Sequence, residues 1–135
     1  MKRIEKYLPI AVDVIDDIIL HQRTKVEPEW DNAICNFGAA IRTIGLYPAV
    51  YAFSNDSEKS KISRSLLMKC IIRIILLTER GVCENNQSLR EYVKVSPYNL
   101  LVRRKVEDAS IALKLALRLF IDNPKNEKEE EDEDN

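Results

Sequence analysis

The sequence predicts an all-α fold, a compact single-domain helical bundle of about five to six helices over residues 1–124, followed by a disordered acidic C-terminal tail over residues 125–135. Apolar residues recur at helical spacing along most of the chain, and only 3 of its 135 residues are Gly, which favours long helices. The tail contains no apolar side chain, so it cannot bury enough surface to offset the entropy of folding. A chain of this length suits one domain.

The first expected helix covers residues 4–22, where apolar side chains repeat every three or four positions. Pro9 is tolerated near its start because first-turn amides have no partner within a helix. After a polar link, a second helix begins at Pro28, whose fixed φ suits a first helical position, and ends at Gly45, where a left-handed backbone is commonly required. Its inward side chains are expected to be Trp30, Ile34, Phe37, Ile41 and Ile44.

A short helix starts at Tyr47-Pro48, and the polar turn at residues 54–57 is expected to cap a helix over residues 58–80. Apolar side chains cover nearly the whole circumference of this helix, which predicts the buried centre of the bundle. A short helix over residues 89–94 follows. Ser96 is then expected to cap the last helix, with Pro97 in its first turn and its end near Asp122. Its inward side chains are expected to be Val102, Ala109, Ala112, Leu113, Ala116, Leu119 and Phe120.

The formal net charge of −1 is unevenly distributed. The tail carries two basic and seven acidic side chains, which leaves 19 basic and 15 acidic ones in residues 1–124. The body is therefore mildly basic and suits an anionic partner, while the tail either solubilises the protein or folds back over the basic faces. The longest apolar run, residues 66–77, has 12 residues including two cations, well short of the roughly 20 that span a bilayer, so we expect a cytoplasmic protein.

Residue types that catalysis needs are scarce. His21 is the only histidine, and no two glycines are close enough to form a phosphate-binding loop. Asp13, Asp16 and Asp17 are expected on one helix face, where they either hold a hard cation, as in a metal-dependent nuclease, or meet basic residues of another helix or chain. We expect the second arrangement, and hence no enzymatic activity, no metal and no cofactor. The three cysteines are expected to be reduced and mostly buried thiols: Cys35, Cys70 and Cys83.

Basic residues offer the clearest binding chemistry. Lys69 and Arg73 lie one turn apart on the apolar helix, so their side chains must emerge through a gap between neighbouring helices. Residues 103–105 are three consecutive cations that fan across about 200° and cannot all face one neighbour. Lys114 and Arg118 continue the face of Arg103.

These cations either contact RNA phosphates or form ion pairs with Glu107, Asp108 and the aspartates of the first helix. Tyr51, Tyr92 and Tyr98 either stack on bases or pack in the core and at its rim.

The segment over residues 45–53, Gly-Leu-Tyr-Pro-Ala-Val-Tyr-Ala-Phe, resembles the small all-helical subunit of the type III-B CRISPR effector, the Cmr complex. In that family a Gly-Leu turn leads into a short Ala- and Phe-containing helix, a Ser/Lys-rich link and a long aliphatic helix. Residues 57–61 and 66–77 supply the last two parts here. The last helix is similar to the family's closing segment in four residues: Ala112, Leu117, Arg118 and Phe120.

The resemblance implies a non-catalytic structural role in antiviral defence. Small subunits of that family stack along the backbone subunits of an RNA-guided complex, beside the crRNA, and help to hold the target RNA. The expected partners are therefore the backbone and large subunits, copies of this chain and single-stranded RNA, with no membrane and no small-molecule substrate. The alternatives are a type III-A small subunit and a purely protein-binding helical adaptor.

Five residues are the candidate RNA contacts: Arg42, Lys69, Arg73, Arg104 and Arg118. Only Arg118 lies in a stretch that resembles a family motif, and the other four rest on helix geometry.

Overall fold

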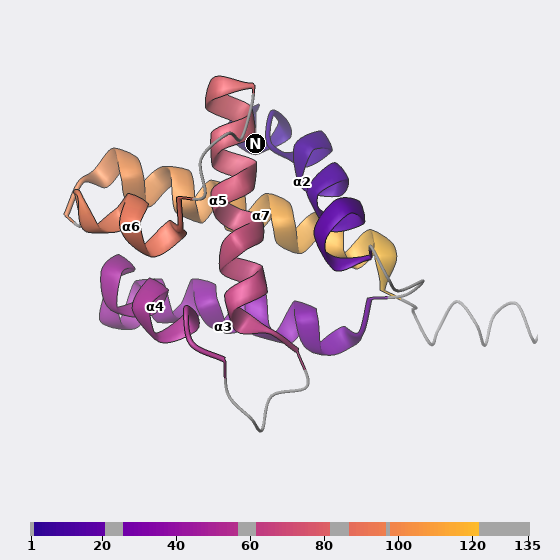
Figure 1. Cartoon of the computed structure of the whole chain (residues 1–135), viewed down its shortest axis with the longest axis horizontal. Coiled ribbons are helices and arrows are strands. Elements are labelled where there is room, and N and C mark those ends of the chain that lie inside the picture. Colours follow the sequence, from indigo (N-terminus) through magenta and orange to yellow (C-terminus); the bar gives the residue numbers. More distant parts are fainter. Residues whose placement is uncertain (1, 21–25, 57–61, 82–86, 97, 122–135) are drawn as a thin grey trace, which may run out of the picture.

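Helices make up almost all of the regular structure. The computed structural model describes residues 2–20, 26–56, 62–81, 87–96 and 98–121 (Figure 1). The elements in chain order are α1 (Lys2–Glu5), α2 (Leu8–Val14), the π-helix η1 (Ile15–Ile19), α3 (Pro28–Ile44), α4 (Leu46–Phe53), α5 (Arg64–Arg80), α6 (Leu89–Lys94) and α7 (Leu100–Phe120). The only strand-like pairing in these ranges is one isolated bridge between Val26 and Ile121. The all-α prediction is confirmed, and the predicted tail lies outside the described residues.

The first predicted helix is present but divided into three parts. Pro9 lacks an amide hydrogen and its ring collides with the carbonyl four residues earlier, so α1 ends at Glu5 and α2 begins at Leu8 with Pro9 in its first turn. After Val14 the helix widens into η1, where the amide of Leu20 donates to the carbonyl of Ile15 at 2.9 Å. A π-helical turn of this kind shifts the register of the side chains that follow it.

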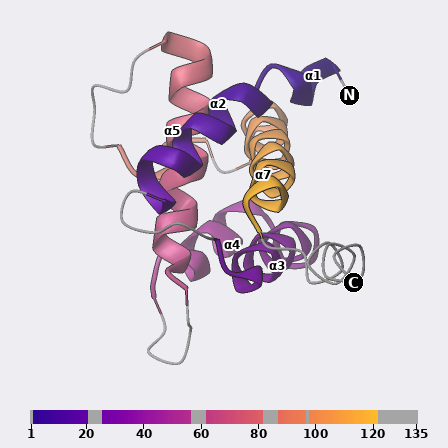
Figure 2. The same cartoon turned by 90° about the vertical axis from the view of Figure 1, so that its right-hand side faces the viewer.

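The core lies around α5, as its all-round apolar pattern predicts. In Figures 1 and 2, α5 crosses α7 and is flanked by α2, and its lower end reaches the level of α3 and α4. Its fully buried side chains include Leu67, Cys70, Ile71, Ile74 and Ile75. None of the described helices is long and apolar enough to cross a lipid bilayer.

Gly45 forms a one-residue corner between α3 and α4. Its φ of 97° is positive as expected, but its ψ of 164° is extended rather than left-handed helical, a combination that essentially only glycine adopts. Ile44, just before the corner, is 54% exposed, which corrects the prediction that it points inward. It lies on the apolar side of α3 but at the end of the helix, where a surface hollow described below leaves it uncovered.

Two helix starts differ from the predicted ones. The helix expected from residue 58 begins at Arg64, because Ser63 is its N-cap and accepts from the amide of Leu66 at 3.1 Å. The last helix begins at Leu100 rather than near Pro97, because Asn99, not Ser96, is its cap. The Asn99 side chain accepts from the amides of the second and third residues that follow it.

One side chain of α7 that was predicted to face inward is exposed. The helix buries Ala109, Ala112, Leu113 and Ala116, whereas Leu119 is 71% exposed. At 100° per residue Leu119 lies only about 70° from the centre of this stripe. It is nevertheless exposed, contrary to the prediction, because it lies in the last turn of α7.

Candidate nucleic-acid interface

A groove lies between α3 and α7, and four cations lie in it or at its ends: Arg42, Arg103, Lys114 and Arg118. The two helices run antiparallel, since Asp31 near the start of α3 contacts Arg118 near the end of α7. At the opposite end, Ile44 of α3 and Arg103 of α7 line one pocket. A cavity of about 160 Å³ lies between these contacts. We call it the α3/α7 groove, and its lining includes Cys35, Gly38 and Arg42 from α3 and Glu107, Ile111 and Lys114 from α7.

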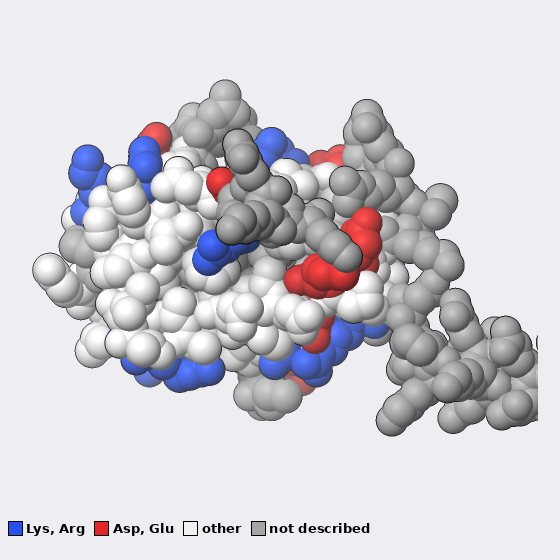
Figure 3. All heavy atoms as spheres, turned by 90° about the horizontal axis from the view of Figure 1, so that it is seen from below, with Lys and Arg blue, Asp and Glu red and all other residues white. Residues whose placement is uncertain are grey.

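The groove carries more positive than negative charge. Arg42 is exposed and Lys114 is half-buried, and neither has an ion-pair partner within the described part of the chain. Arg103 donates to Glu107 at 2.6 Å near one end, and Arg118 donates from Nε to Asp31 at 3.1 Å at the other. Two cations are therefore partly neutralised and two remain available to an anion. Figure 3, viewed from the side of α3 and α4, shows Lys and Arg side chains gathered in two groups along its lower edge.

Gly38 is one of the residues that line the α3/α7 groove. It lies in the middle of α3, and a Cβ built at this position would come within 3.8 Å of the Arg42 guanidinium, an ordinary contact distance. A methyl group at this position would therefore fit beside the Arg42 side chain.

The predicted pair on α5 lies in a different place. Arg73 donates to Asp17 of η1 at 2.9 Å, and Lys69, one turn earlier, is exposed without an ion-pair partner among the described residues. This confirms that at least one aspartate of the first helix meets a cation of another helix. Arg73 thus belongs to the contact between α5 and η1, and neither Lys69 nor Arg73 lies on the helices that form the α3/α7 groove.

Consecutive cations at the start of α7 diverge as predicted. Arg103 donates to Glu107, which lines the groove, whereas Lys105 points to α5 and donates to Glu79 at 2.5 Å. This hydrogen bond raises the pKa of Lys105 above its ordinary value of 10.5, and burial raises the pKa of Tyr7 and Tyr92 beside the same pair. Arg104, between Arg103 and Lys105 in the sequence, is exposed to solvent.

Of the five predicted RNA contacts, the structure brings Arg42 and Arg118 into one surface. Lys69 and Arg73 lie on α5, and Arg104 is exposed on α7 but is not among the residues that line the groove. Lys114 was singled out in the sequence but was not among the five, although it completes the groove. The helical periodicity of α7 cannot single out Lys114 from the other cations of the helix, because Lys114 gains its place in the groove from Arg42 on the facing helix α3.

The acidic and thiol groups do not assemble into a reactive centre in the part of the chain that the structure describes. No group of three His, Cys, Asp or Glu side chains there is arranged to hold a metal ion. Cys70 is buried, and burial raises the pKa of its thiol to about 12. Cys35 is half-buried beside the groove, and Cys83 lies outside the described residues.

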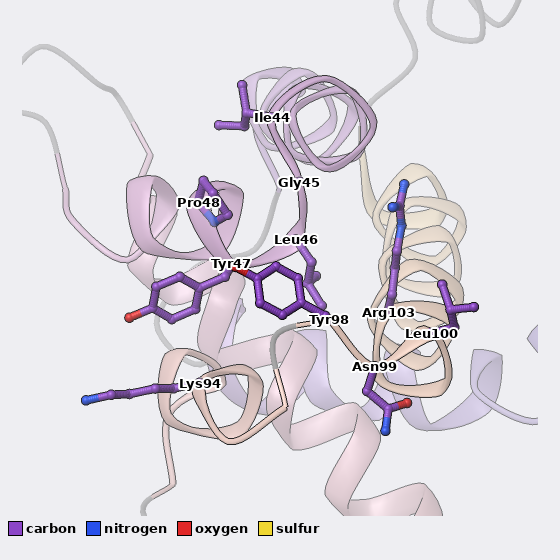
Figure 4. A pocket seen from close by; sticks show the side chains of 10 residues that line it. All are labelled: Ile44, Gly45, Leu46, Tyr47, Pro48, Lys94, Tyr98, Asn99, Leu100 and Arg103. Atoms are coloured by element: carbon purple, nitrogen blue, oxygen red, sulfur yellow. The ribbon is translucent and has the colours of Figure 1, made fainter.

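A second, larger hollow lies at the end of the groove, beside the Gly45 corner. It measures about 690 Å³, and we call it the α4/α7 pocket (Figure 4). Side chains from four segments line it, among them Leu46, Tyr47, Lys94, Tyr98, Leu100 and Arg103. The sequence pointed to Tyr98 as one of three tyrosines able to stack on bases. Tyr92 is half-buried and Tyr51 is 50% exposed, but Tyr98 is 95% exposed.

Comparisons of the chain with models of protein families, with characterised proteins and with solved structures found no match.

Proposed function

We propose that this protein is a non-catalytic helical subunit of an RNA-guided effector of the type III-B CRISPR class, and that it holds single-stranded RNA by its phosphates along the α3/α7 groove. The observation that carries the RNA contact is the pairing of two unneutralised cations, Arg42 and Lys114, across one groove. The family assignment is supported by the resemblance of residues 45–53, whose Gly-Leu turn is the corner between α3 and α4.

The chemistry of the groove suits a phosphate backbone better than base edges. A guanidinium binds phosphate oxygens through two parallel hydrogen bonds, and an ammonium adds a mobile point charge. Arg118 uses Nε for Asp31, so its terminal nitrogens remain able to donate to a phosphate. Contacts of this kind position a strand without reading its sequence, so the groove should bind RNA with little sequence preference.

Membership of a larger assembly is supported by exposed apolar side chains. Leu100 is 79% exposed and Leu101 58%, next to each other at the start of α7, and Tyr98 just before them is 95% exposed. Neighbouring apolar side chains in contact with water often mark surfaces that a protein partner covers. The same observation favours the second candidate function, a helical adaptor that contacts only proteins. In the adaptor, Arg42 and Lys114 would face acidic groups of a partner instead of RNA.

Binding of fluorescein-labelled single-stranded RNA to the full chain, followed by anisotropy over a range of salt concentrations, tests the RNA contact. With about 3–5 phosphates engaged, log K should fall against log salt with a slope of roughly −2 to −4. Arg42→Glu combined with Lys114→Glu should weaken binding about tenfold or more at low salt, because each change replaces an attraction by a repulsion.

The matched control is Lys69→Glu combined with Arg73→Glu, which changes the net charge by the same amount on other helices. Circular dichroism should show that both double variants remain helical. If the control variant weakened RNA binding as much as the groove variant does, the α3/α7 groove would not be the binding site. If the wild-type chain bound no RNA at all, RNA binding itself would be refuted.

Isolation of the chain from its native host tests the assignment to an assembly. We expect it to co-purify with several proteins and a guide RNA, and ultraviolet crosslinking should give RNA adducts on α3 or α7. Protein crosslinks without RNA adducts would support the adaptor instead. Recovery of the chain alone would contradict both the RNA-holding subunit and the adaptor.

A further inference from the structure

We infer that the α4/α7 pocket receives an unstacked base of the single-stranded RNA whose phosphates lie along the α3/α7 groove, an inference that rests on the proposed function. The volume of about 690 Å³ falls within the roughly 300–1,000 Å³ of pockets that hold drug-sized ligands, and a single nucleotide is of that size. The pocket is also larger than the α3/α7 groove, which measures about 160 Å³.

The walls of the pocket suit a flat, weakly polar ring. Leu46, Pro48 and Ile44 form the side nearest the Gly45 corner, and Leu100 contributes from the start of α7. Figure 4 shows the ring of Tyr98 reaching from the start of α7 toward Leu46 and Tyr47. Since 95% of the Tyr98 side chain is exposed, its ring has free faces on which a base can stack.

The charges of the pocket suit the phosphates on either side of that base. Lys94 and Arg103 contribute positive charge, and none of the described residues that line the pocket is acidic. Lys94 is exposed and has no ion-pair partner in the described ranges. Arg103 donates to Glu107 at 2.6 Å, so its charge is partly neutralised and Lys94 is the freer of the two cations.

Continuity with the groove links the base to the rest of the strand. Arg103 lines the pocket, and its partner Glu107 lines the groove beside Arg42 and Lys114. A single-stranded RNA that runs along the α3/α7 groove toward the Gly45 corner therefore reaches the α4/α7 pocket directly. An apolar segment of a protein would fill the same hollow, but it would make no use of the two cations or of the free faces of Tyr98. These features favour a nucleotide.

An anisotropy experiment with two oligonucleotides of equal length separates the pocket from the groove. One is a ten-nucleotide single-stranded RNA, and the other carries the same phosphates but abasic ribose units in place of every base. We expect the full-length wild-type chain to bind the intact RNA at least about fivefold more tightly, since stacking of one base on an aromatic ring contributes that much or more. Tyr98→Ala should remove most of this difference and leave the abasic oligonucleotide unaffected, whereas Tyr98→Phe should retain it. Leu119→Ala, an exposed apolar truncation at the far end of α7, is the matched control and should change neither affinity.

The outcomes distinguish this inference from the proposed function. If wild type binds the intact and abasic oligonucleotides equally, with a steep salt dependence, the pocket holds no base while the groove still binds phosphates. If Tyr98→Ala leaves the intact RNA as tightly bound as before, the inference is likewise overturned, and an apolar protein segment becomes the better occupant. If the wild-type chain binds neither oligonucleotide, the proposed function fails and the inference fails with it.

Discussion

Arg118 in the last turn of α7 forms an ion pair with Asp31 in the first turn of α3, with 3.1 Å between Nε and Oδ1, although the two residues are 87 positions apart in the sequence. The ion pair joins α3 to α7 at one end of the α3/α7 groove, and it partly neutralises the Arg118 guanidinium. Arg118 remains 52% exposed, so the contact contributes at most about 1 kcal/mol to stability.

Asp31→Asn is therefore expected to increase RNA affinity about two- to fivefold at low salt, because removing a unit charge near a phosphate is worth up to about 1 kcal/mol in water. The free energy of unfolding should change by less than about 1 kcal/mol. Anisotropy and urea denaturation measure the two quantities. Asp13→Asn is the matched control, since it removes one exposed carboxylate from α2. An equal gain in both variants would show that net charge, and not the groove, sets the affinity.

Gly38→Ala should stabilise the protein by about 0.5–1 kcal/mol, because alanine loses less backbone entropy than glycine within a helix. The added Cβ meets only the Arg42 guanidinium, at 3.8 Å. Gly81→Ala should have the opposite effect, with a loss of about 1–2 kcal/mol, because Gly81 has a left-handed φ of 74°. Urea denaturation of the two variants compares them. Destabilisation by Gly38→Ala would mean that α3 and α7 pack more closely at this point than the groove allows.

Asp56 stabilises the start of α5 in a pH-dependent way. Its carboxylate accepts from the amide and from the hydroxyl of Ser65, both at 2.9 Å, and these hydrogen bonds lower its pKa below the ordinary 3.8. A carboxyl whose pKa is lower in the folded state contributes stability above its unfolded pKa and loses it as the pH falls through the folded pKa. Asp56→Ala should thus cost about 0.5–2 kcal/mol at neutral pH, the usual cost of losing a helix cap.

The difference between wild type and Asp56→Ala should shrink as the pH is lowered through and below 3.8. Urea denaturation at several pH values measures it. A difference that stays constant into acid would show that the charge of the carboxylate is not what stabilises α5.

Cys70 should be inert toward thiol reagents in the folded protein. Burial raises its pKa to about 12, so only about one thiol in ten thousand is ionised at pH 8, and the side chain is enclosed by the core. A Cys35→Ser/Cys83→Ser variant, which retains Cys70 alone, should not react with a disulfide reagent until urea unfolds it. A Cys70→Ala/Cys83→Ser variant should react faster through the half-buried Cys35. Rapid labelling of native Cys70 would mean that α5 is not enclosed as described.

The local pattern of the chain determined the helices and most of the core. Apolar residues at spacings of three and four identified the buried faces of Trp30, Ile34 and Phe37, and the all-round apolar pattern identified α5 as the centre. The same reasoning predicted the divergence of Arg103 and Lys105, because neighbouring side chains on a helix point 100° apart whatever surrounds them.

Tertiary packing alone decided which of the cations share a surface. Helical periodicity relates residues within a few turns, whereas the partners of Arg118 and Arg73 lie 87 and 56 residues away in the sequence. The antiparallel packing of α3 on α7 therefore brings Arg42 to Lys114, and it leaves Ile44 uncovered beside the α4/α7 pocket. The sequence determined which side chains leave each helix and in which direction, and the packing of the helices decided which of them share a surface.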